Sequence, residues 1–150
     1  MAAIVMTAGI FAGCSTAKTT TKGNQATGNT IKIGVNMELS GAAAGYGQSQ
    51  KQGIQLATSE INKNGGINVN GKKKKIQLII RDNKTSTNTS ASVAAQLTNN
   101  DKVVAIVGPA TTNAGTAQIP NITKAAVPSV SPSATDPAYT LKKNGKVQPY

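Results

Sequence analysis

The sequence predicts an α/β domain in which a parallel sheet is covered by helices on both faces. Strand-like runs alternate along the chain with segments of helical periodicity, and the connections between them are short. One run, "VVAIV" at 103–107, is apolar throughout, as expected for a strand buried on both faces. We therefore expect the carboxyl ends of the strands to meet at one edge, where sheets of this class bind their ligands.

The first half of the domain is expected to contain a strand, a loop and a helix. Residues 31–37, "IKIGVNM", alternate and are rich in β-branched side chains, which predicts a strand. Small residues at 41–47 predict a loop. Residues 48–64 then place apolar side chains at helical spacing, and Gly65 and Gly66 supply a stop signal.

The second half repeats this alternation. A second strand, "KIQLIIRD" at 75–82, precedes a helix expected at 90–100, which is entered from a segment rich in capping residues. A third helix is expected at 113–126, limited or kinked by Pro120. Residues 127–137, "VPSVSPSATDP", predict a short fourth strand and a hydroxyl-rich loop.

The formal net charge of +11 requires an explanation. Nucleic-acid binding predicts clustered basic residues with stacking aromatic side chains nearby. The only cluster, Lys72 to Lys75, has no aromatic neighbours, so the sequence favours a solvated turn there and no nucleic-acid partner. A diffuse basic surface also favours contact with anionic lipid or wall polymer.

The composition excludes most enzyme chemistry. Without histidine, the commonest general base and metal ligand is missing, and Ser40, Ser131 and Ser133 cannot be activated as in serine hydrolases. One cysteine allows no intramolecular disulfide and no cysteine metal cluster. The glycines match neither a phosphate-binding loop nor a dinucleotide fingerprint. We expect binding without chemistry, with no cofactor and no metal.

The N-terminus resembles an export signal. Residues 1–14, "MAAIVMTAGIFAGC", form an apolar run too short to span a bilayer, and Phe11 to Cys14 resemble a bacterial lipobox. The resemblance implies a lipid-modified Cys14. Residues 15–29 form a polar segment without an apolar face, which predicts a flexible tether. We expect the folded part, residues 30–150, to lie outside the cytoplasmic membrane, anchored through Cys14.

The domain resembles periplasmic binding protein type I, in its branched-chain amino acid (leucine-binding) branch. The motifs are "IKIGVNMELSGAAAGYG" at 31–47, the helix end "INKNGGI", "DN" after the second strand, "VVAIVGP" followed by small hydroxyl residues, and "VPSVSPSATDP". The resemblance runs from about Ile31 to Tyr150. It implies the first lobe of a two-lobe domain, with the second lobe missing from this sequence.

The resemblance also implies where a ligand carboxylate is held. In this family, hydroxyls and backbone N–H groups of the loop after the third strand hold it, which here matches Thr112, with Ala110 at the neighbouring position. Donors at a helix N-terminus suit an anion. On residue chemistry alone, Thr112 could simply cap the third helix, a role that is compatible with ligand binding because the cap would lie at the site.

The opposite end of an amino acid is assigned in the same way. The family holds the ammonium with a backbone carbonyl and a hydroxyl of the loop after the fourth strand, which matches Ser133 and Thr135, with Ala134 between them. An aromatic side chain of the first loop flanks the ligand, and this matches Tyr46. Without the resemblance, the hydroxyl residues could be turn formers beside Pro132, and Tyr46 could simply pack its loop.

Two acidic residues, Glu38 and Asp82, are expected near this edge. Glu38 follows the first strand and either selects for a cation or faces water, so we place it outside the site. Asp82 is expected to close the loop after the second strand and not to touch ligand.

The function implied by the resemblance is that of an extracytoplasmic solute-binding lipoprotein. It would capture an amino acid by hinge closure and deliver it to an ABC transporter permease. An alternative is a sensor or regulator of the same fold that detects amides or other small solutes. A nucleotide-binding enzyme half is a further alternative, which predicts protection against unfolding by nucleotides.

Overall fold

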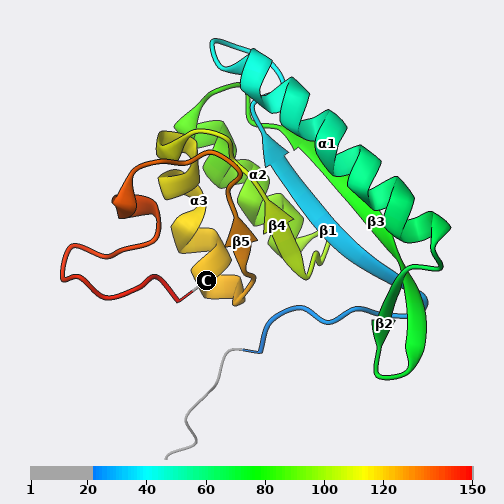
Figure 1. Cartoon of the computed structure of the whole chain (residues 1–150). Helices are drawn as coiled ribbons and strands as arrows, with labels where there is room; N and C mark the ends of the chain where they lie inside the picture. Colours follow the sequence, from blue (N-terminus) through cyan, green and yellow to red (C-terminus); the bar gives the residue numbers. More distant parts are fainter. Residues whose placement is uncertain (1–21, 150) are drawn as a thin grey trace, which may run out of the picture.

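The computed structural model describes residues 22–149. Its five-stranded sheet has the order β2-β3-β1-β4-β5, and β2 alone runs antiparallel to its neighbour (Figure 1). The elements are β1 (Thr30–Met37), α1 (Ala44–Lys63), β2 (Ile67–Val69), β3 (Lys72–Asp82), α2 (Thr87–Asn99), β4 (Ala105–Val107), α3 (Thr112–Ala125), β5 (Ser129–Val130) and the short 3-10 helix η1 (Pro137–Tyr139). The predicted fold class is confirmed.

Helices cover both faces of the sheet. Figure 1 shows α1 on one face and α2 with α3 on the other. Successive residues of β1 point to opposite faces of the sheet. Val35 and Met37 are buried on the side of α1, whereas Gly34 lies against Leu97 of α2. The core is aliphatic, as the composition predicts, and its larger cluster lies between the sheet, α2 and α3.

The lysine cluster does not form a turn, so this expectation is wrong. Lys72 to Lys75 begin β3, which pairs with β2 in a hairpin that the sequence interpretation missed. The turn consists of Asn70 and Gly71, both with positive φ, at 51° and 80°. Asn-Gly is the residue pair most typical of two-residue hairpin turns, so the signal was present.

The expected helices are confirmed, with different bounds. α1 begins at Ala44, so the second half of the expected 41–47 loop is its first turn. Ser86 caps α2, and its side chain accepts a hydrogen bond from the Thr89 N–H. α3 continues through Pro120 and ends at Ala125, with Ala126 in a left-handed conformation.

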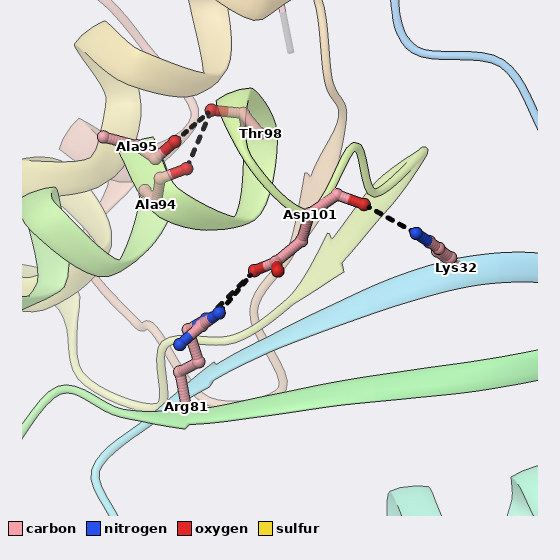
Figure 2. Close-up of polar contacts among 6 residues, drawn as sticks. All are labelled: Lys32, Arg81, Ala94, Ala95, Thr98 and Asp101. Atoms are coloured by element: carbon pink, nitrogen blue, oxygen red, sulfur yellow. Dashed lines mark hydrogen bonds and ion pairs between the residues drawn. The ribbon is translucent and has the colours of Figure 1, made fainter.

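A charged cluster joins the sheet to the end of α2, as Figure 2 shows. Arg81 donates from Nε and from Nη2 to one carboxylate oxygen of Asp101, at 3.0 and 2.8 Å. Lys32 donates to the Asp101 carbonyl at 3.3 Å. Because the pair is partly exposed, its net contribution is about 0–1 kcal/mol. Because Asp101 lies between α2 and β4, these contacts hold that connection against the sheet.

The export-signal prediction, including Cys14, lies outside the described residues. Residues 22–29 are described, and they differ from a loose tether because Asn24 donates to the carbonyls of Thr98 and Val103, at 2.8 and 3.0 Å. Figure 1 shows that this segment meets the domain at the end opposite the carboxyl ends of β1 and β3. Within the described part of the chain, no helix has the length and apolar character needed to cross a membrane.

Candidate functional site

The carboxyl edge of the sheet carries a cleft of about 450 Å³. It lies where the start of α1, the β4–α3 loop and the β5–η1 loop meet. The residues that line it are Tyr46, Ala110, Thr111, Thr112, Ser133 and Thr135. Five of the six residues implied by the family resemblance are therefore brought together. Ala134 does not line the cleft, and Thr111 was not predicted.

The β4–α3 loop forms one wall, and its backbone is tightly fixed. Gly108 has a φ of 101°, and a Cβ there would lie 2.1 Å from the carbonyl oxygen of Asn36. Only glycine fits such a close approach at a positive φ. On the other side, the Gln118 amide donates to the Gly108 carbonyl at 3.0 Å.

Thr112 begins α3 but does not cap it. The N-cap is Thr111, whose side chain makes no cap hydrogen bond, so the alternative of a capping role for Thr112 is wrong. The first N–H groups of a helix have no intrahelical acceptor, and Thr112 lies among them. Its hydroxyl accepts a hydrogen bond from the Asp136 N–H at 3.3 Å, which joins α3 to the β5–η1 loop.

Glu38 is fully buried, and both roles considered for it are wrong. One carboxylate oxygen accepts from the Ala110 N–H at 2.8 Å, and the other from the N–H and hydroxyl of Thr111, at 3.1 and 2.8 Å. The side chain therefore does not face water, and it is not exposed at the cleft, where it could select for a cation. It holds the β4–α3 loop from behind the cleft wall.

The β5–η1 loop forms the second wall through its serines. The Ser131 hydroxyl donates to the Pro109 carbonyl at 2.6 Å and accepts from the N–H groups of Ser133 and Ala134, as a turn-forming serine does. The Ser133 hydroxyl donates to the Ala110 carbonyl at 2.8 Å and accepts from Gln50 of α1 at 2.8 Å. These bonds fix the two loops against each other.

Tyr46 lies in the first turn of α1 and not in a loop, which corrects the expectation. Its side chain is 68% exposed and lines the cleft. The position is set by Gly47, where a Cβ would lie 2.0 Å from the Glu38 carbonyl oxygen. The start of α1 thus packs backbone to backbone on the end of β1.

Asp82 closes the neighbouring loops, as predicted. It accepts hydrogen bonds from the Ser40 hydroxyl at 2.6 Å and from the N–H groups of Leu39, Ser40 and Lys84. Burial raises the pKa of the Asp82 carboxyl, but these hydrogen bonds outweigh burial and hold the pKa below its usual range. Asp82 does not line the cleft.

A buried polar network supports the site from below, and the sequence interpretation missed it. Asn36 of β1 donates to the Ser90 hydroxyl at 3.0 Å and to the Gln118 side chain at 3.1 Å, and it accepts from Asn83 at 3.2 Å. Gln118 also contacts the Tyr139 hydroxyl at 3.3 Å. Satisfied buried networks rigidify a structure. This one connects β1, α2 and α3 beneath the β4–α3 loop.

The cleft offers hydroxyls, backbone groups and one aromatic ring. Such groups can bind both ends of a small polar solute but supply no nucleophile–base pair. Among residues 22–149, no group of three His, Cys, Asp or Glu side chains could hold a metal ion. The groups that line the cleft are suited to hydrogen bonding with a small polar solute.

These features define one lobe of a ligand-binding protein. The chain belongs to the periplasmic binding protein family, whose model matches residues 30–150. The family membership confirms the resemblance seen in the sequence and the expectation of a binding protein and not an enzyme.

Individual relatives make the comparison more specific. The chain is 50% identical to the branched-chain amino acid transporter substrate binding protein LivJ of Streptococcus pneumoniae, solved in complex with isoleucine, with a TM-score of 0.69 over 74% of this chain. It is 33% identical, over 75% of its length, to the Leu/Ile/Val-binding protein BraC3 of Rhizobium johnstonii. A solute binding protein of an ABC transporter from Rhodopseudomonas palustris, in complex with 3,4-dihydroxy benzoic acid, is 32% identical over 75% of this chain, with a TM-score of 0.65.

The matched region is a limited part of each relative. The chain spans 31% of the LivJ chain, 29% of BraC3 and 30% of the Rhodopseudomonas protein.

Proposed function

We propose that the full-length protein is an extracytoplasmic solute-binding protein that captures an amino acid, with branched-chain amino acids preferred, and delivers it to an ABC transporter permease. The cleft carries the proposal, because Thr112, Ser133 and Thr135 line it together with an exposed Tyr46. The 50% identity to LivJ, which was solved with isoleucine, supports the choice of ligand.

The chemistry of the cleft suits a zwitterion. The start of α3 and the Thr112 hydroxyl supply donors for a carboxylate, and the β5–η1 loop supplies carbonyl and hydroxyl acceptors for an ammonium. Hydrogen bonds to charged groups contribute about 1.5–3 kcal/mol each. A second lobe would then close over the ligand and shift an open–closed equilibrium.

An aromatic carboxylate is a second candidate ligand. The observation in its favour is the Rhodopseudomonas relative in complex with 3,4-dihydroxy benzoic acid, together with the exposed Tyr46 ring at this cleft. Aromatic rings in contact favour stacked or edge-to-face arrangements.

Calorimetric titration of the full-length protein tests the proposal. Isoleucine, leucine and valine should bind with Kd values of about 1 μM or tighter, equivalent to about 8 kcal/mol. Acetamide, which has no ammonium and no carboxylate, tests the amide-sensor alternative, and 3,4-dihydroxybenzoate tests the aromatic carboxylate. Binding of either of these without any branched-chain amino acid would refute the proposal.

We also propose that a lipid at Cys14 anchors the protein to the membrane. Residues 22–29 meet the domain at the end opposite the carboxyl ends of β1 and β3 (Figure 1). The cleft lies at that carboxyl edge, so an anchored protein would hold it away from the membrane. Replacing Cys14 by alanine should release the protein from the membrane fraction without changing ligand affinity. Retention of the variant in that fraction would contradict the anchor.

A further inference from the structure

Glu38 is a buried charge that the binding proposal does not use. Its side chain has no solvent exposure, and one backbone N–H donates to each of its carboxylate oxygens. Donation to both oxygens is the pattern expected for an ionised carboxylate. The ion pair found among the described residues joins Arg81 to Asp101, and no basic side chain is paired with Glu38 there.

The partners of Glu38 form the wall of the cleft. Ala110 and Thr111 line it, yet their backbone N–H groups point inward to the carboxylate. These two N–H groups at the entry to α3 are therefore not available to a ligand anion. The negative charge also offsets the positive end of the α3 dipole.

We propose that Glu38 is a specificity-determining residue that makes the cleft discriminate against ligands with a net negative charge. The inference rests on the proposed function and sharpens its ligand class: a zwitterion, whose ammonium balances its carboxylate, binds in preference to a monoanion of the same shape. A buried like charge close to a carboxylate disfavours the charged pair, because the low-dielectric wall screens it poorly.

The test compares two ligands that differ only in the ammonium group. Isoleucine and 3-methylpentanoate share one carbon skeleton, and the second lacks the amino group. Their Kd values are measured by competition in the full-length protein, in the wild type, in Glu38→Gln and in Glu60→Gln. Glu60 is an exposed carboxylate in the last two turns of α1, so its variant removes the same charge away from the cleft.

The ratio of the two Kd values is the informative readout. In Glu38→Gln, the side-chain NH2 group replaces one carboxylate oxygen and faces a backbone N–H that then has no acceptor. The affinity lost in this way should be the same for both ligands. Removal of the charge should instead shift the ratio by about tenfold in favour of 3-methylpentanoate. Glu60→Gln should leave the ratio unchanged.

Two other results would overturn the inference. Equal loss of affinity for both ligands would mean that Glu38 only shapes the loop, and the proposed function would survive. Failure of the wild type to bind isoleucine would overturn the proposed function and the inference together.

A second variant covers the case in which Glu38→Gln does not fold. Thr111→Val removes one of three donors to the carboxylate and leaves its charge less compensated. The ratio should then shift further against 3-methylpentanoate. A shift in the opposite direction, or none, would contradict the inference.

Discussion

The hydroxyl of Ser133 donates a 2.8 Å hydrogen bond to the carbonyl oxygen of Ala110, and this bond joins the two loops that form the cleft. The same hydroxyl accepts from Gln50 of α1 at 2.8 Å. Together with the Ser131 bond to the Pro109 carbonyl, Ser133 therefore holds the two cleft walls in place, and its hydroxyl proton is already donated within the protein. Any contact between Ser133 and a ligand ammonium would use its carbonyl or its remaining lone pair.

Ser133→Ala should lower the free energy of unfolding by about 1 kcal/mol, because it removes one donor and leaves Gln50 without this acceptor. Isoleucine affinity should fall as well, since the loops lose one of the hydrogen bonds that connect them. Ser92→Ala is the control, because the Ser92 hydroxyl is exposed and bonds only within α2. Chemical denaturation and calorimetry of the full-length variants measure both effects. Equal effects of the two substitutions would contradict this role for Ser133.

Two glycines of α1 should respond in opposite ways to alanine. A Cβ at Gly47 would lie 2.0 Å from the Glu38 carbonyl oxygen, so Gly47→Ala must displace α1 or β1 and should cost about 1–3 kcal/mol. Nothing lies within 4 Å of a Cβ at Gly53, so Gly53→Ala should stabilise the helix by about 0.5–1 kcal/mol. Thermal and denaturant unfolding of the pair measures this. A destabilised Gly53→Ala variant, or a neutral Gly47→Ala variant, would show that the packing is different.

Acid should remove the contribution of Asp82 to stability. Its pKa in the folded state lies below the ordinary value, because its hydrogen bonds outweigh the effect of burial. The stabilisation is therefore fully present above the ordinary pKa of about 3.9 and is lost as the pH falls through the lower, folded-state value. Wild type and Asp82→Asn should differ in unfolding midpoint near pH 7, and the difference should shrink as the pH falls well below about 3.9. A difference that persists undiminished at such low pH would contradict the hydrogen-bonded carboxylate.

The sequence predicted the alternation of strands and helices because each element carries its own periodic signal. The prediction failed for side chains whose hydrogen-bond partners lie far away in the sequence. The Glu38 side chain looks exposed from its neighbours in the sequence, but its donors are 72 and 73 positions away. The polar network around Asn36 depends on Gln118 in the same way, 82 positions away.

Local signals were also misleading at two places. The glycines at 45 and 47 predicted a loop, whereas Gly47 is required inside α1 by the close approach of β1. The run of lysines at 72–75 was interpreted as a turn, whereas the turn is the Asn-Gly pair just before it, which specifies the β2–β3 hairpin. The cleft residues, by contrast, came from the family motifs, because composition and spacing alone left turn-forming roles open.

The most direct measurement is the affinity of full-length Thr112→Ala for isoleucine, compared with Thr116→Ala on the same helix. Thr112 lines the cleft at the start of α3, whereas Thr116 is exposed and does not line it. Loss of the hydroxyl should weaken binding by about tenfold, equivalent to about 1.4 kcal/mol, and Thr116→Ala should bind as the wild type does. Unchanged affinity in Thr112→Ala would remove this residue from the site and contradict the placement of the ligand at the α3 edge of the cleft.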